Sequence, residues 1–268
     1  MIVETMSDLE IKDEILFDYN IIRTSSTISR FFDEYILYRN KYKIKPNEEG
    51  ILIKRFKTKN KNNWIILLKK KDFQFFTNEN EDIAAYLYIQ FNTSKGIRIA
   101  QPTPSNIILI YNGHLFTRYR ERMNINIVAT KSIIEHFYSK NHEGYQLFFP
   151  KDENDEYKMI TFSMDGYLLG NTKFLNEENA WLVHKTFIPY QLGSKKHSIG
   201  LDKFSCKIAM YILSCISENQ KIDDKTILFA NKIGIMINNE IVVELEEYIK
   251  QFPQEIIDDI NPEMYLLK

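Results

Sequence analysis

The chain has 268 residues, of which 44% are hydrophobic and 26% are charged, and its formal net charge is −1. This composition provides a packed core and excludes a disordered or collagen-like chain. With 9 glycines and 2 cysteines, a glycine-rich phosphate loop and a disulfide framework are also excluded as organising features.

The first third of the sequence predicts helices followed by strands. Residues 8–45 are expected to be mainly helical, because apolar residues from Ile28 to Ile36 recur at the three- and four-residue spacing of a helix with one buried face. Apolar runs at residues 51–56 and 64–68 flank the polar segment 59–63. This arrangement predicts a β-hairpin.

The middle of the chain predicts a sheet interrupted by two helices, at residues 114–123 and 129–139. The Asp165-Gly166 pair predicts a two-residue hairpin turn. From residue 203 onward the pattern is helical again, and Pro253 ends a helix expected from Ile241. Short apolar or β-branched runs indicate the strands, at residues 98–100, 107–111, 145–149, 157–162, 167–170 and 180–188.

The predicted fold class is therefore α+β, with a central, mainly antiparallel sheet and helical flanks at both ends. The predicted organisation is a helical region 1–50, an α+β core 51–200 and a helical region 201–268, with all three as parts of one domain as the alternative. No apolar run reaches the ~18 residues of a membrane span, and the first residues do not resemble a secretory signal. We therefore expect a cytoplasmic protein without a membrane partner.

Charge is distributed unevenly along the sequence. Residues 39–71 contain twelve basic and two acidic residues, whereas residues 218–268 contain five basic and eleven acidic ones. A basic segment of this kind suggests a surface for polyanions, although lysines on a solvated strand face give the same pattern. The candidate nucleic-acid contacts are Lys54, Arg55, Lys57, Lys59 and Lys61.

Aromatic residues lie among these cations, at Tyr42, Phe56 and Trp64. Lysines for phosphates and aromatic rings for base stacking would suit a single-stranded nucleic acid. Strand alternation allows two arrangements. The aromatic and basic groups share one exposed face, or the aromatic rings enter the core while the lysines point into water.

The segment 113–123 predicts an amphipathic helix with a reactive polar face. At 100° per residue, one face of this helix carries His114, Arg118, Glu121 and Arg122. Cleavage of RNA through its 2′-hydroxyl needs a base, an acid and a cation for the phosphorane charge. His114 and Glu121 are candidates for proton transfer, and Arg118 and Arg122 for gripping phosphate. The alternative is a solvated helix face with ordinary side-chain pairs.

The run His114-x3-Arg118-x2-Glu121-Arg122 resembles the helix of small bacterial toxin-like domains of the broad RelE type. The resemblance covers about residues 105–190. It implies short helices paired with an antiparallel sheet, and RNA that is cleaved or bound by basic side chains.

The leading hypothesis is thus a nucleic-acid-directed protein, in its sharper form a metal-independent ribonuclease that needs no cofactor and acts on RNA. The alternative is a non-enzymatic interaction or structural protein of a phage or mobile element, with a protein as its partner. An enzyme should gather the four side chains from His114 to Arg122 in a concave, partly buried site, whereas an interaction protein should spread them on a convex surface.

Overall fold

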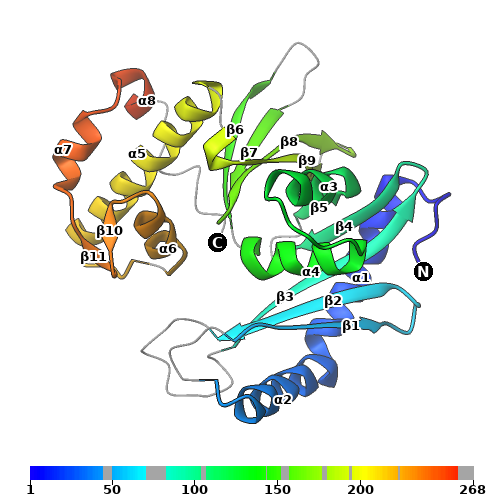
Figure 1. Ribbon diagram of the computed structural model, residues 1–268. Helices are drawn as coiled ribbons and strands as arrows, with labels where there is room; N and C mark the ends of the chain where they lie inside the picture. Colours follow the sequence, from blue (N-terminus) through cyan, green and yellow to red (C-terminus); the bar gives the residue numbers. More distant parts are fainter. Residues whose placement is uncertain are drawn as a thin grey trace.

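The computed structural model describes residues 1–44, 50–70, 83–103, 107–142, 144–151, 157–176, 180–192, 195–222 and 224–258. In this part of the chain, a nine-stranded sheet has the strand order β1-β2-β3-β4-β5-β9-β8-β7-β6 (Figure 1). Its strands are β1 (Leu52–Lys57), β2 (Asn63–Lys70), β3 (Ile83–Thr93), β4 (Gly96–Pro102), β5 (Ile108–Asn112), β6 (Tyr145–Lys151), β7 (Tyr157–Phe162), β8 (Gly166–Phe174) and β9 (Ala180–Pro189).

The sheet is mainly antiparallel, as the sequence predicts. Neighbouring strands run antiparallel except for β5 and β9, which pair in parallel. Helices precede and follow the sheet in the chain, which confirms the α+β class with helical flanks. Among the described helices, none combines the length and the apolar character needed to cross a bilayer.

Helices cover both faces of the sheet around β2. Trp64, Ile66 and Leu68 of β2 belong to one core, which they share with α1 (Asp8–Thr24) and α2 (Ser26–Lys41). The alternating residues Ile65 and Leu67 belong to a second core, shared with α3 (Gly113–Arg122) and α4 (Thr130–Asn141). A strand buried on both faces is apolar throughout, which explains the continuous run at residues 64–68.

A third core joins the other end of the sheet to the C-terminal helices (Figure 1). The ring of Phe162 in β7 stacks on the ring of Phe204, with centroids 4.2 Å apart. Phe204 in turn meets Phe229 edge-on at 5.4 Å. The elements of this region are η1 (Tyr190–Leu192), α5 (Lys195–Ser217), α6 (Asp224–Lys232), β10 (Met236–Ile237), β11 (Glu240–Ile241), α7 (Leu245–Lys250) and α8 (Gln254–Asp258).

Some boundaries differ from the sequence prediction. The turn between β7 and β8 closes with a hydrogen bond from Ser163 N to Gly166 O, so Met164 and Asp165 are its central residues. Gly166 already belongs to β8, where an added Cβ would lie 2.2 Å from the carbonyl oxygen of Ile188. This glycine therefore serves the close approach of two strands and not the turn itself.

The C-terminal region also departs from the prediction. Helix α5 begins at Lys195 instead of residue 203. The helix expected from Ile241 begins at Leu245, because Ile241 pairs with Met236 in the β10–β11 hairpin. The sequence analysis did not identify that hairpin. Its turn residues Asn238 and Asn239 have φ angles of 51° and 67°, a conformation that asparagine tolerates better than most residues.

Candidate nucleic-acid interface

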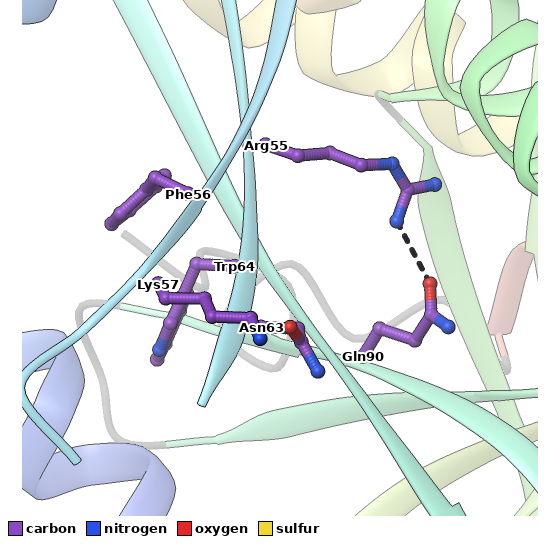
Figure 2. Close-up of a pocket in the computed structure, with 6 residues that line it drawn as sticks. All are labelled: Arg55, Phe56, Lys57, Asn63, Trp64 and Gln90. Atoms are coloured by element: carbon purple, nitrogen blue, oxygen red, sulfur yellow. Dashed lines mark hydrogen bonds between the residues drawn. The ribbon is translucent and has the colours of Figure 1, made fainter. Parts of the chain in front are cut away.

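An open hollow of about 360 Å³ lies on the sheet at the β1 edge (Figure 2). The residues that line it are Arg55, Phe56, Lys57, Asn63, Trp64 and Gln90. Two of them, Arg55 and Lys57, belong to the set of cations that the sequence predicts to contact nucleic acid. The hollow therefore coincides with part of the predicted nucleic-acid site.

The polar lining of the hollow comes from one row across three strands. Lys57 of β1 lies opposite Asn63 of β2, and Asn63 lies opposite Gln90 of β3. Residues directly opposite each other in a sheet share a face, so these three side chains emerge side by side. Lys57 and Asn63 are exposed and Gln90 is half-buried. The row is therefore accessible to a ligand from solvent.

Arg55 holds this row against α4. Its Nε donates to Glu135 Oε1 at 2.8 Å, and its Nη1 donates to Gln90 Oε1 at 2.9 Å (Figure 2). A third contact, from Nη2 to the carbonyl oxygen of Lys131, measures 3.4 Å. All three nitrogens of the guanidinium are engaged. Arg55 therefore orients Gln90 and joins β1 to α4 instead of presenting a free cation.

Lys54 is also neutralised, on the opposite face of β1. Its ammonium pairs with the carboxylate of Glu34 in α2. Strand alternation thus sends Lys54 and Arg55 to helices on different faces of the sheet. The two side chains connect the edge strand to both helical layers, which is a structural role that the sequence pattern did not indicate.

The remaining three predicted cations, Lys57, Lys59 and Lys61, are exposed. Within the described residues, none of them has an acidic partner. Lys57 ends β1, and the other two belong to the β1–β2 turn. Of the five predicted cations, Lys54 and Arg55 are thus held in ion pairs with helices. The three exposed lysines lie together at one end of the hairpin and have no acidic partner among the described residues.

A buried carboxylate fixes the turn that carries these lysines. Asp18 of α1 is 2% exposed and accepts four hydrogen bonds from residues of the hairpin. The donors are Thr58 Oγ1 at 2.7 Å, Asn60 Nδ2 at 3.1 Å, Asn62 Nδ2 at 2.7 Å and Trp64 Nε1 at 3.1 Å. Each donor replaces part of the hydration that the carboxylate loses on burial. The lysines therefore extend from a turn of defined geometry.

The aromatic residues of this region pack mostly in the core. Trp64 is 0% exposed, and the ring of Phe56 lies 5.0 Å from that of Phe31 in α2. Figure 2 shows both side chains projecting away from Arg55 and Gln90. Of the two arrangements that strand alternation allowed, the structure has the aromatic rings in the core and the lysines in water. Tyr42, at the end of α2, is 60% exposed.

Helix α3 presents three of the four predicted catalytic residues together. Nε of Arg118 donates to Nε2 of His114 at 3.1 Å, and Nη1 of Arg118 donates to Glu121 Oε2 at 3.0 Å. The side chains of Arg118 and Glu121 are 43% and 47% exposed. This polar face lies in solvent, and the hollow beside β1 has no lining residue from α3.

Arg122, the fourth predicted residue, has a different environment. Its guanidinium donates to the carbonyl oxygen of Phe187 in β9, so it ties the end of α3 to the sheet. It is half-buried, whereas His114 is exposed. The helical face predicted from the sequence thus divides into a solvated group of three and one cation with a structural contact.

A polar network that the sequence analysis missed lies on the buried side of α3. Tyr119 donates its hydroxyl proton to Asp165 Oδ2 at 2.8 Å, and Asn141 of α4 donates to the same oxygen at 2.9 Å. His136 Nδ1 lies 3.3 Å from the Tyr119 hydroxyl. Burial, and then the charge of Asp165, raise the pKa of Tyr119. This network joins both helices to the β7–β8 turn.

Within the described part of the chain, no group of three His, Cys, Asp or Glu side chains is arranged to hold a metal ion. Comparison with family models, curated proteins and solved structures found no match to this chain.

Proposed function

We propose that the protein binds single-stranded nucleic acid, with RNA as the leading substrate, through the hollow beside β1 and the lysines of the adjoining turn. The observation that carries the proposal is the position of Lys57, Lys59 and Lys61. All three are exposed and without acidic partners among the described residues, at the end of β1 and in the adjoining turn that Asp18 holds in place. Fixed, unpaired cations bind a phosphate backbone without losing an existing ion pair.

The neutral part of the hollow supports an unpaired strand over a duplex. Asn63 and Gln90 place side-chain amides beside Lys57 in one row. Amides hydrogen-bond to the edges of bases, whereas lysine contacts phosphate. In an RNA duplex, the Watson–Crick edges are paired and the major-groove edges lie in a groove too deep and narrow for side chains to read. An exposed row on a sheet is accessible to splayed-out bases of a single strand.

The test is the binding of a fluorescently labelled single-stranded RNA, followed by anisotropy. The triple variant Lys57→Ala, Lys59→Ala, Lys61→Ala should bind about tenfold or more weakly than the unmodified protein, because each lost phosphate contact weakens binding. A triple variant with Lys221, Lys232 and Lys250 changed to Ala removes the same charge from the acidic C-terminal region and serves as the control.

Equal weakening by the two triple variants would contradict the proposal, because it would show an effect of net charge alone. Absence of RNA binding by the unmodified protein would also contradict it. That result would favour the alternative of an interaction or structural protein whose partner is another protein, since exposed lysines contribute to protein interfaces as well.

A second candidate function is metal-independent cleavage of RNA at α3, in the manner of a RelE-type toxin. It is favoured by one observation, the hydrogen-bonded series of His114, Arg118 and Glu121 on an accessible helix face. In this scheme His114 and Glu121 exchange protons with the 2′-hydroxyl and the leaving oxygen, and Arg118 faces the phosphate. Arg122 is left out of it because of its contact with Phe187.

Cleavage of labelled RNA in the presence of EDTA tests this second candidate. The scheme predicts cleavage by the unmodified protein and its loss in both His114→Ala and Arg118→Ala. Binding without cleavage would leave the protein as an RNA-binding protein and eliminate the ribonuclease. Circular dichroism of each variant checks that the helix remains folded.

A further inference from the structure

The orientation of the Gln90 amide in the hollow is fixed by its neighbour. Arginine has only donor groups, so the atom of Gln90 that faces Arg55 Nη1 at 2.9 Å is the acceptor Oε1. The Nε2 end of the amide therefore points away from Arg55. Among the described residues, Nε2 of Gln90 has no hydrogen-bond partner. Arg55 Nε in turn donates to Glu135 Oε1 at 2.8 Å, and this bond fixes the guanidinium that orients the Gln90 amide.

The row across the strands is consequently rich in donors. Gln90 offers the N–H groups of Nε2, Lys57 adds an ammonium group, and Asn63 adds an amide with both a donor end and an acceptor end. The side-chain oxygen of Gln90 faces Arg55 and accepts its hydrogen bond, so the end of the amide that is left to face a ligand is the donor Nε2. A ligand that pairs well here must present acceptors to the Gln90 position, because a donor placed there would face another donor.

We propose that the hollow selects guanine among the bases of a single strand, by pairing Gln90 and Asn63 with the O6 and N7 acceptors of that base. This inference rests on the proposed nucleic-acid binding. On its Hoogsteen edge guanine presents two adjacent acceptors, O6 and N7, whereas adenine presents N7 beside the N6 amino donor. A glutamine that is free to turn reads adenine with both ends of its amide, whereas the Oε1 end of Gln90 is turned toward Arg55 and its Nε2 end is the one that faces a base.

The experiment compares RNA oligonucleotides of uridine that differ at one central position. Guanosine at that position should bind about tenfold more tightly than adenosine, the size expected for one well-made bidentate contact. Replacing guanosine by 7-deazaguanosine, which lacks the N7 acceptor, should remove most of this preference. Its Watson–Crick edge is unchanged, so this comparison isolates the edge that the hollow is proposed to read.

Two protein variants locate the effect. Gln90→Met keeps a side chain of similar length without a donor, and it should abolish the preference for guanosine over adenosine. The control is Asn92→Met, on the same strand and exposed. It should retain the preference.

Equal affinity for the guanosine and adenosine oligonucleotides would overturn the guanine inference, as would a preference that survives in Gln90→Met. Either result leaves the proposed function intact, provided that oligouridine binds and that binding depends on Lys57, Lys59 and Lys61. If none of the oligonucleotides binds, the proposed function fails and this inference fails with it.

Discussion

The indole nitrogen of Trp64 donates a hydrogen bond to Oδ2 of Asp18 at 3.1 Å, and neither side chain is more than 2% exposed. This contact joins α1 to the start of β2, next to the β1–β2 turn. Asn62 donates to the same oxygen at 2.7 Å. The lysines that carry the proposed function are therefore coupled to the packing of α1, although nearly forty positions separate the two segments in the chain.

Removing the charge of Asp18 should destabilise the protein and loosen the hairpin. Asp18→Asn turns one acceptor oxygen into a donor, which in either orientation of the amide faces a donor of the hairpin, Asn60 on one side or Asn62 and Trp64 on the other. A buried hydrogen bond to a charged group contributes about 1.5–3 kcal/mol. We expect a loss of about 3 kcal/mol in the free energy of unfolding, measured with urea. The exposed Asp13 of the same helix provides the control, and Asp13→Asn should change stability little.

Arg122 and Arg118 should differ in stability, since one is tied to the sheet and the other lies in solvent. Arg122→Ala removes the donor to the Phe187 carbonyl, so it should cost about 1–2 kcal/mol of unfolding free energy. Arg118→Ala breaks an exposed pair with Glu121 and should cost less than about 0.5 kcal/mol. Urea unfolding of both variants checks this. Equal costs would contradict the structural role given to Arg122.

Stability should fall below neutral pH because of His184. This side chain is 0% exposed, contacts Thr161 Oγ1 at 2.8 Å, and burial lowers its pKa to about 3 from an ordinary value of 6.5. Between pH 6.5 and about pH 3, His184 binds a proton in the unfolded chain but not in the folded protein. The free energy of unfolding therefore decreases as the pH falls through this interval. From about pH 7 to about pH 5.5 the loss should be about 1 kcal/mol.

The comparison for this prediction is His184→Gln, measured by urea unfolding at both pH values. The variant lacks the imidazole, so its stability should change by about 1 kcal/mol less than that of the unmodified protein over the same interval. Contributions from groups that the two proteins share cancel in this comparison. Identical pH dependence of the two proteins would show that His184 is not buried in its neutral form.

The salt dependence of RNA binding should report each lysine separately. For single strands, the slope of the logarithm of affinity against that of salt concentration decreases by about 0.7 per phosphate contact. Lys57→Ala, Lys59→Ala and Lys61→Ala each remove one contact, so each should make the slope less negative by about this amount. Lys250→Ala, which removes a lysine paired with Glu247, should leave the slope unchanged. A slope that is the same for all four variants would mean that the lysines do not contact phosphate.

Local patterns in the sequence predicted most of the elements. The continuous apolar run at residues 64–68 located β2 and the helical spacing located α2, because burial of both strand faces and of one helix face imposes these patterns directly. The 11-residue strand β3, which carries Gln90, was missed. Its signal was present in the apolar run Ala84–Phe91 and in the turn that leads to Gly96. The hollow could not be assembled from the sequence without that strand.

The division of roles within each predicted set depends on tertiary contacts. Lys54 and Arg55 are adjacent in the sequence, but their partners Glu34 and Glu135 come from helices on different faces. No local pattern indicates that these two cations are neutralised while Lys57 is not. The helical wheel likewise placed Arg122 with Arg118, and only the position of Phe187 in β9 separates them.

An NMR titration of isotope-labelled protein with single-stranded RNA tests directly whether the strand binds beside β1. We expect the side-chain amide signals of Asn63 and Gln90 to shift, together with the backbone amide signals from Lys57 to Lys61, and all shifts to saturate with one binding constant. Shifts confined to α3, or to the acidic C-terminal helices, would contradict it, because the strand would then lie on a surface other than the hollow beside β1.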